Sequence, residues 1–205
     1  MELLKALESR ASVRSFEPEQ VPIADIKELV RRAGMAPSLN NYQPWNFIAI
    51  TNKELLNQMA RVVSDKIASF PQGKTRNSGN IIGQVEWFST FFKDAPLVIA
   101  VVMDKYESVL EKSTSFTHEE VNRLRNYPDY QNAGACIQNI LLSAVDLGYG
   151  ACWLSAPLIA REEIERILQV EAPRQVMAFV AVGKASGSTK PKAKKNFNEI
   201  FNLRD

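Results

Sequence analysis

The stretch APSLNNYQPW, residues 36–45, separates a predicted helix from a predicted strand. Its two prolines, one serine and two asparagines are typical of a turn-forming loop. The stretch ends on Gln43, Pro44 and Trp45, and a mere surface turn has no use for so large an aromatic side chain. A loop that is held between regular elements and carries amides and an aromatic ring suits the rim of a planar ligand. The alternative is an ordinary helix-to-strand connection with a tryptophan in the core.

The length and composition are those of an ordinary globular domain. The chain has 205 residues, of which 45% are apolar and 23% are charged, which is enough for one domain with a full core. We predict a single domain over residues 1–205, with an extended C-terminal arm from about residue 184, where Gly, Ser, Pro and Lys predominate. The net charge of +2 predicts no strong attraction to nucleic acid or to an anionic membrane.

No stretch has the features of a membrane span, a signal peptide or a metal site. The longest apolar run, residues 95–103, is too short to cross a bilayer, and the first residues, MELLK, lack a signal-peptide core. Cys136 and Cys152 form neither a CxxC pair nor a metal-ligand cluster. The single histidine, His118, offers little to a zinc site or a serine–histidine triad. We expect no metal, a reducing and cytoplasmic location, and a solvated surface position for His118.

Helical and strand patterns alternate along the chain, which indicates an α/β or α+β domain. We predict helices at residues 2–9, 22–33, 53–69, 81–92, 131–147 and 161–168, and strands at 46–51, 97–103, 151–155 and 175–183. Asn52 is the expected cap of the third helix. Residues 71–80 are predicted to be a loop and residues 196–203 a short final piece. The polar segment 104–129 has weak periodicity, and we expect it to lie over the core as a mobile excursion, in the manner of a lid.

The segment Arg10-Ala11-Ser12-Val13-Arg14 places two arginines and a serine at alternate positions. In an extended segment alternate side chains point the same way, so these three would share one face while Ala11 and Val13 face the core. Two guanidinium groups around a hydroxyl group form a good cradle for an oxyanion or a phosphate. The alternative is a solvated basic strand near the terminus.

The common nucleotide-binding loops are missing. No GxGxxG sequence follows the first strand, and no GxxxxGK[ST] sequence occurs. A nucleotide bound here is therefore held in neither the Rossmann nor the P-loop manner.

Four short motifs occur in an order that resembles the FMN-dependent nitroreductase superfamily. The first is Arg10-x-Ser12-x-Arg14, and the second is APS at residues 36–38 followed by NxQPW at 41–45. The third is GxGACW at residues 148–153, after an apolar helix, and the fourth is the lysine-rich segment 191–195 before a short terminal piece. No single motif is decisive, but together they cover nearly the whole chain in the right order.

The resemblance implies an α+β fold, in which helices wrap a mixed sheet and two chains form an intertwined homodimer. Two FMN molecules would bind at the dimer interface. The nearly uncharged helix predicted at residues 131–147 would then be covered by the partner, and the C-terminal arm would wrap around the partner subunit.

The resemblance also implies how the phosphate and the pyrimidine ring of FMN are held. Arg10, Ser12 and Lys194 would bind the phosphate through charge-assisted hydrogen bonds, with Lys195 as the alternative in the tail. Arg14 would lie near N1 and the C2 carbonyl group, where a cation stabilises the reduced flavin.

The remaining implied contacts surround the isoalloxazine ring. Asn132 would meet its pyrimidine end, and a backbone N–H group of Ser155 or Ala156 would fix the hydrogen bonding of N5. The implied set is Trp153, Leu154, Ser155 and Ala156 of one subunit, and Pro37, Ser38, Leu39 and Asn41 of the partner. No side chain is expected to be catalytic, because FMN carries the chemistry.

Three features depart from the family pattern. The tail has lysines where arginine is common, and lysine is a point charge that should hold a phosphate less tightly than the guanidinium fork. Ser155 stands where some bacterial nitroreductases have glutamate, which leaves N5 to the backbone alone. Residues 87–92 contain four aromatic side chains and match no flavin contact of the family. We expect a core helix there, and the alternative is one wall of the flavin channel.

The function implied by the resemblance is an FMN-dependent NAD(P)H oxidoreductase. Hydride would pass through flavin N5 in a ping-pong scheme to a nitroaromatic, a quinone or a similar small acceptor. Reductive dehalogenation and flavin destruction need motifs that this sequence does not show. One alternative is a flavin-binding or sequestering protein with little turnover. Another is a nucleic-acid module that uses residues 184–195, which the low net charge disfavours.

Overall fold

Four strands form one sheet with the order β1-β2-β4-β3 in the computed structural model, which describes residues 2–71, 78–106 and 108–204. The strands are β1 Trp45–Ile50, β2 Leu97–Met103, β3 Gly150–Leu154 and β4 Gln175–Gly183. All three pairings between these strands are antiparallel. The one parallel pairing in the described part of the chain is the isolated bridge between Ser12 and Ala151. Antiparallel strands with separate helices make an α+β fold, as predicted.

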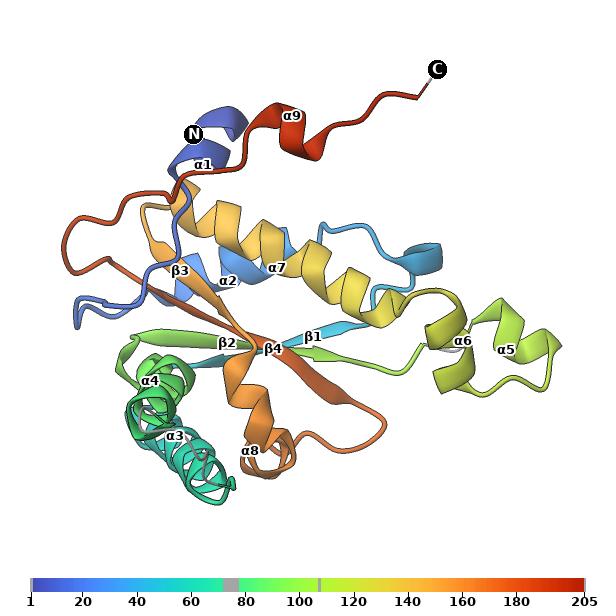
Figure 1. Ribbon diagram of the computed structural model, residues 1–205, viewed down its shortest axis with the longest axis horizontal. Helices are drawn as coiled ribbons and strands as arrows, with labels where there is room; N and C mark the ends of the chain where they lie inside the picture. Colours follow the sequence, from blue (N-terminus) through green and yellow to red (C-terminus); the bar gives the residue numbers. More distant parts are fainter. Residues whose placement is uncertain (1, 72–77, 107, 205) are drawn as a thin grey trace.

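Helices cover both faces of the sheet (Figure 1). One face carries α2, Ile23–Ala33, and α7, Pro128–Asp146. The other carries α3, Lys53–Ala68, α4, Ser78–Thr90, and α8, Arg161–Ile167. Two hydrophobic clusters result. Leu56, Met59 and Phe179 lie in one, and Leu29, Ile137 and Ile140 in the other.

Strand β2 is buried along its whole length and supplies both clusters. Val98, Ala100 and Val102 enter the cluster under α3, and the residues between them enter the cluster under α7. Successive side chains of a strand point to opposite faces, so a central strand covered on both sides reads as one continuous apolar run. This is why residues 97–103 are readable as a buried strand.

The helix boundaries largely follow the predicted ones. Asn52 caps α3, since its side-chain oxygen accepts hydrogen bonds from the backbone N–H groups of Glu54 and Leu55 at 2.9 and 3.2 Å. Pro22 is the N-cap residue of α2, and Gly34 is its C-cap residue.

The predicted loop at residues 71–80 is wrong at its end, because α4 begins at Ser78. Residues 72–77 lie outside the described part of the chain. The predicted core helix at residues 81–92 is also only partly correct. Phe91 and Phe92 are buried in the 3-10 turn Phe91–Asp94. Trp87 and Phe88 are 52% and 47% exposed, because they lie on the outer side of α4.

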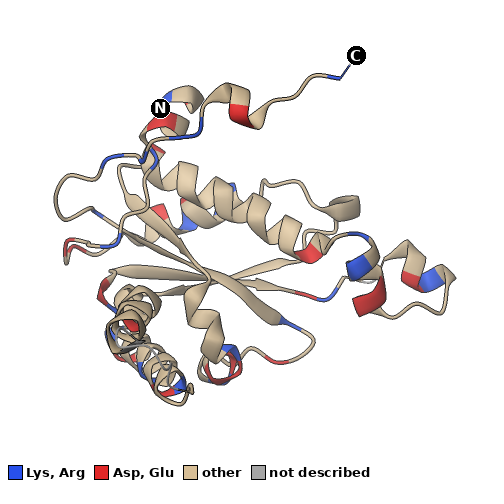
Figure 2. Ribbon diagram, in the orientation of Figure 1, with Lys and Arg blue, Asp and Glu red and all other residues tan. Residues whose placement is uncertain are grey.

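Helix α7 begins at Pro128, three residues before the predicted start, and almost no charged residue lies along it (Figure 2). Within the single chain it packs on the sheet and α2, which bury Ala133, Cys136, Ile140 and Ala144. Its apolar character is therefore largely explained without a partner. No described helix is long and apolar enough to cross a membrane.

The predicted excursion at residues 104–129 contains two short helices, α5 Val109–Ser113 and α6 His118–Leu124, which project from the body (Figure 1). Each begins with a capping box, formed by Ser108 with Glu111 and by Thr117 with Glu120. Helix α1, Leu3–Ser9, and helix α9, Phe197–Ile200, both lie on the outside of the molecule, and α1 contacts α7. The arm between β4 and α9 is extended, as predicted.

Candidate functional site

A pocket of about 200 Å³ lies between the segment that follows α1 and the C-terminal arm. It is lined by Arg10, Ala11, Ser12, Arg14, Thr189, Lys190, Lys192 and Lys194. Figure 2 shows basic residues both on the segment after α1 and along the arm. The three alternating residues Arg10, Ser12 and Arg14 therefore share one pocket, together with a lysine of the arm. Lys195 is not among the lining residues.

The segment is held in place by Val13. Its backbone N–H group donates to the carbonyl group of Ala151 at 3.0 Å, and its side chain is buried against Gly150. An extended segment with Val13 directed inward turns its neighbours Ser12 and Arg14 outward. Ala11 was expected to face the core like Val13. It is instead half-buried and lines the pocket, because the segment leaves the sheet edge before Ser12.

The positive charges that line the pocket form no ion pair within the part of the chain that the structure describes. Among the described residues, Arg10, Lys192 and Lys194 have no carboxylate partner. Lys184, at the start of the arm, differs from them in binding Glu19 at 2.7 Å. Uncompensated cations around a hydroxyl group favour an anion, and guanidinium groups suit the oxygens of a phosphate.

Arg14 contacts an aromatic ring and a backbone carbonyl group. Its guanidinium carbon lies 5.6 Å from the ring centroid of Phe88, and its Nη1 donates to the carbonyl oxygen of Ser12 at 3.5 Å. The thiol of Cys152 lies close by. Burial raises the pKa of this thiol, and the charge of Arg14 and a hydrogen bond with Ser12 offset only part of that effect. Cys152 is therefore a neutral, inert thiol at neutral pH.

The loop at residues 36–45 is anchored to its surroundings by side-chain hydrogen bonds. The N–H group of Leu39 donates to Asn132 Oδ1 at 3.1 Å, and Asn40 Nδ2 donates to the hydroxyl group of Tyr106 at 2.6 Å. Ser38 Oγ accepts from the N–H group of Gln43 at 2.9 Å. The loop therefore has a defined shape, held from α7 on one side and from the start of the excursion on the other.

Trp45 packs, partly buried, against the cluster under α2 and α7. The alternative of a core tryptophan therefore describes Trp45 better than a ligand rim does. Only the polar part of the loop, where Asn41 is exposed, is available to form the rim of a ligand site.

Asn132 is buried, and its Nδ2 has no hydrogen-bond partner in the described part of the chain. The bond from Leu39 occupies its oxygen, so the free atom is the donor nitrogen. An unpaired buried donor carries a desolvation cost that an acceptor of a bound ligand would relieve.

At the end of β3, Trp153 is exposed, whereas Leu154 is buried in the core. Ser155 is exposed at the start of the 3-10 turn Ala156–Ala160, in which Ala156 is half-buried. A Cβ atom added to Gly134 of α7 would lie 3.7 Å from the indole of Trp153, so the indole lies beside the first half of α7.

The predicted site residues form two separate groups, one at each end of α7 (Figure 1). The basic pocket lies near its end, where Val13 and Val145 line a neighbouring pocket. The loop with Leu39 lies near its start, at Asn132. Asn132 and Val145 are thirteen residues apart on α7, which corresponds to about 20 Å along the helix axis. Neither Asn132 nor the loop lines the basic pocket.

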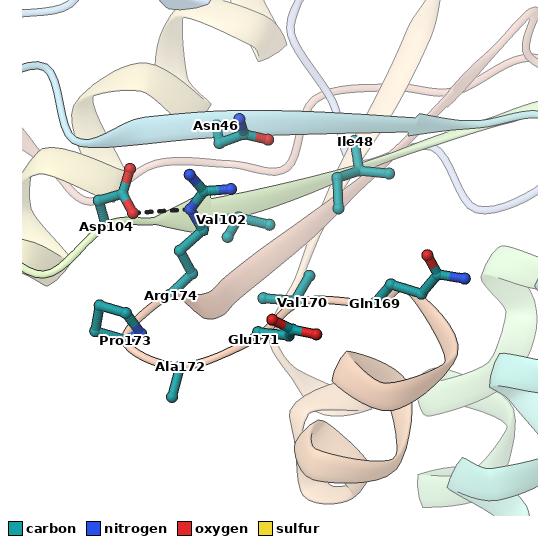
Figure 3. A pocket seen from close by; sticks show the side chains of 10 residues that line it. All are labelled: Asn46, Ile48, Val102, Asp104, Gln169, Val170, Glu171, Ala172, Pro173 and Arg174. Carbon is teal, nitrogen blue, oxygen red and sulfur yellow. Dashed lines mark hydrogen bonds and ion pairs between the residues drawn. The ribbon is translucent and has the colours of Figure 1, made fainter.

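A larger pocket, of about 410 Å³, lies at the start of β4 and holds none of the predicted site residues. Figure 3 shows Arg174 directed toward Asp104, and Nε of Arg174 lies 2.9 Å from Asp104 Oδ1. The basic pocket lies beyond the other end of β4. Because its arginine is already paired with a carboxylate, the larger pocket is a poorer anion site.

Sequence reasoning missed Lys190 and Lys192 as lining residues of the basic pocket. Lys190, Lys192 and Lys194 alternate in an extended arm, so they share one face by the same rule that groups Arg10, Ser12 and Arg14. It also missed the contact between Phe88 and Arg14, because no signal in the sequence identifies these two residues as neighbours.

Most of the chain matches one protein family. The Nitroreductase family model matches residues 7–184, which include the segment from Arg10 to Arg14, the loop and all four strands.

The chain belongs to the Nitroreductase family.

Relatives of this nitroreductase-family chain carry several names. A Methanothermobacter thermautotrophicus protein with the provisional name NADH dehydrogenase/NAD(P)H nitroreductase is 29% identical over 184 residues, covering 89% of this chain and 75% of that protein. The iodotyrosine dehalogenase 1 homolog of Caenorhabditis elegans is 26% identical, covering 88% of this chain and 54% of that protein.

Solved structures of nitroreductase-like proteins match the fold over its full length. A BluB-like flavoprotein from Clostridium difficile 630 has a TM-score of 0.88 and 29% identity, with both chains fully covered. A nitroreductase with bound FMN from Desulfitobacterium hafniense DCB-2 has a TM-score of 0.75 and 22% identity, again with both chains fully covered.

Proposed function

We propose that this chain is an FMN-dependent NAD(P)H oxidoreductase that reduces a small-molecule acceptor such as a nitroaromatic or a quinone. The observation that carries the proposal is the basic pocket formed by Arg10, Ser12 and the arm in a chain of the Nitroreductase family. The relative named NADH dehydrogenase/NAD(P)H nitroreductase supports the electron donor, and the similar flavoprotein and FMN-bound structures support the cofactor.

The residues present fit the two polar ends of FMN. Arg10, Ser12 and Lys194 offer charged and hydroxyl donors to the phosphate. Near the loop at Leu39, Asn132 Nδ2 is an unpaired donor among the described residues, and it fits a carbonyl oxygen of the pyrimidine ring. When bound, FMN supplies the hydride exchange at N5 between NAD(P)H and the acceptor.

Each protein group has a limited task in this reaction. Arg14 presents a positive charge from the basic pocket and favours the reduced, anionic form of the ring. The backbone N–H groups of Ser155 and Ala156 would be available to N5, and the exposed ring of Trp153 would back the flavin ring. No acid or base from the protein is needed. Cys136 and Cys152 are free thiols, which fits a reducing compartment, and we propose the cytoplasm.

We also propose that two chains complete each site. In one chain the basic pocket lies near Val145 of α7 and the loop with Pro37, Ser38 and Leu39 lies near Asn132, so a partner would supply the loop. Apolar side chains that a partner would cover are exposed on α1, on α9 and just after α9, namely Leu3, Leu4, Leu7, Phe197, Ile200, Phe201 and Leu203.

The function is tested by flavin content and turnover. The purified protein should contain oxidised FMN and should oxidise NADH or NADPH only when an acceptor is present. The acceptor panel should contain a nitroaromatic, a quinone and, because of the iodotyrosine dehalogenase relative, an iodotyrosine. FMN binding without turnover on any of them would favour the alternative of a flavin-sequestering protein.

The assembly is tested by sedimentation of the FMN-loaded protein. We expect a mass twice that of the 23.0 kDa chain at all working concentrations, because the site needs residues from two chains. A 23.0 kDa monomer that still holds FMN would contradict the shared site.

Replacing Arg10 with alanine should weaken FMN binding by about 1–3 kcal/mol, or roughly 5- to 150-fold, because a charged donor to the phosphate is lost. The measurement is titration of the apoprotein with FMN, followed by the quenching of flavin fluorescence. Lys195→Ala is the matched control, since Lys195 is a basic residue of the same arm outside the pocket. Equal affinities of the Arg10 variant and the wild type would exclude the phosphate role.

A further inference from the structure

Arg14 is held mainly by an aromatic ring. Its guanidinium carbon lies 5.6 Å from the centroid of Phe88, which is within the range of cation–π contacts. Its hydrogen bond to the carbonyl oxygen of Ser12 is long and therefore weak, with a distance of 3.5 Å. A long arginine side chain has many rotamers, and the face of Phe88 is the contact that selects one of them.

Phe88 is in turn held by a row of aromatic rings that reaches the core. Trp87 meets it edge to face, with centroids 4.8 Å apart and planes at 81°. Trp87 stacks on Phe91 with centroids 5.6 Å apart, and Phe91 is only 4% exposed. The pairs have the separations and angles that aromatic rings prefer. A half-exposed phenylalanine is therefore fixed in orientation.

This arrangement gives a reason for the exposure of Trp87 and Phe88. Aromatic side chains on the outer side of a helix forgo the stabilisation that burial would provide. Here the row of rings extends from the core to the edge of the basic pocket and ends under the guanidinium group of Arg14.

We propose that Phe88 is a positioning residue that directs Arg14 into the basic pocket, and so tunes the flavin that binds there. The inference rests on the proposed FMN-dependent function. Phe88 adds no charge and no hydrogen bond, and it acts only by limiting the directions of the guanidinium group. A ring at position 88 should therefore be needed, whereas a phenol ring should serve as well as a phenyl ring.

The contact can be measured in the apoprotein without FMN. The side-chain NMR signals of Arg14 should show a ring-current shift that Phe88→Leu abolishes and Phe88→Tyr retains. Ile81→Ala is the matched control, because Ile81 is an exposed apolar residue of the same helix. Unshifted Arg14 signals in the wild type would overturn the proposal.

The effect on the cofactor is measured by anaerobic redox titration and FMN affinity. Phe88→Leu should lower the preference for reduced over oxidised FMN about threefold, which for a two-electron couple lowers the midpoint potential by about 15 mV. Phe88→Tyr and Ile81→Ala should keep the wild-type potential. Thermal melting of each variant checks that it is folded.

A double-mutant cycle separates positioning from a direct effect of the ring. In an Arg14→Ala background, Phe88→Leu should no longer change the potential. An equal change in both backgrounds, or no change in either, would overturn the role of Phe88 while leaving the oxidoreductase intact. A wild-type protein that takes up no FMN would overturn the proposed function and this role with it.

Discussion

Replacing Gly150 with alanine is expected to lower the free energy of unfolding by about 1–3 kcal/mol, the usual cost of overpacking a core. A Cβ atom at position 150 would overlap Val13 Cγ2 and would lie 2.8 Å from Val13 Cβ. Val13 is buried, and its backbone is bonded to Ala151. The clash is therefore relieved only if the segment from Arg10 to Arg14 separates from β3.

The same change should weaken FMN binding, since that segment carries Arg10, Ser12 and Arg14. For a chain of this size the melting temperature should fall by roughly 2–4 °C per kcal/mol. Calorimetry and FMN titration measure the two effects. Gly134→Ala is the control, because its Cβ atom would have only an ordinary contact of 3.7 Å with Trp153. The control should be neutral or slightly stabilising in the middle of α7.

A second substitution tests the cause. If the clash with Val13 is responsible, Val13→Ala should cost less stability in the Gly150→Ala background than in the wild type, because the two side chains compete for one space. Strict additivity of the two changes would contradict the steric explanation.

Replacing His118 with alanine is expected to loosen the excursion that contains α5 and α6. Nδ1 of His118 lies 2.9 Å from Glu111 Oε1, and its Nε2 lies 2.9 Å from Asp129 Oδ2. Both ring nitrogens therefore face carboxylates, and the amide nitrogen of Asn122 also lies 2.9 Å from Nε2. The histidine thereby joins α5 and α6 to the first turn of α7. Its loss removes one hydrogen-bond partner from each of two poorly solvated carboxylates, at a cost of about 1–3 kcal/mol; Glu111 keeps its bond with Ser108, and Asp129 keeps its bond with Asn122.

The loosening should be local. Amide hydrogen exchange in residues 108–124 should speed up while the amides of β2 and β4 stay protected, because the sheet does not depend on His118. Glu119→Gln is the control, since Glu119 forms an exposed pair with Arg123 at 3.9 Å and such pairs contribute little. Unchanged exchange in the His118 variant would contradict the joining role.

Acidification should loosen the same excursion. Burial alone would raise the pKa of Glu111, but hydrogen bonds from Ser108 and His118 outweigh it and leave the pKa below its usual 4.5. A carboxyl group with a lowered pKa in the folded state stabilises that state above the usual value, and this contribution is lost as the pH falls. Protection of residues 108–124 should therefore decline below pH 4.5, and Glu111→Gln should flatten that decline.

The position of His118 illustrates the limit of sequence reasoning. A lone histidine in a polar segment was expected to be solvated, but its side chain is only 20% exposed and forms part of a charged network. Its partners, Glu111 and Asp129, lie seven and eleven residues away. Only the folding of α5 and α6 against α7 brings them together.

The sequence pattern by itself determined the buried strands and the alternation of Arg10, Ser12 and Arg14, whereas the choice of α+β over α/β came from the family resemblance. The predicted bounds of the strands at residues 97–103 and 175–183 agree with those of β2 and β4. A strand that is covered on both faces forms one continuous apolar run in the sequence. The start of α3 was predictable because a capping asparagine acts on the backbone two and three residues ahead. Each of these features depends on residues that are close to one another in the sequence.

Only the tertiary structure decided which distant residues meet. The arm with Lys190, Lys192 and Lys194 converges on Arg10 from about 180 residues away. The loop at Leu39 lies near Asn132, in the first part of α7, whereas that basic pocket lies near Val145, in its last turn. Trp87 and Phe88 were expected in the core, since aromatic residues usually gain from burial. Burial depends on which elements pack over a side chain. Among the described residues both rings stay about half exposed on the outer side of α4, where Trp87 meets Phe88 and Phe88 meets Arg14.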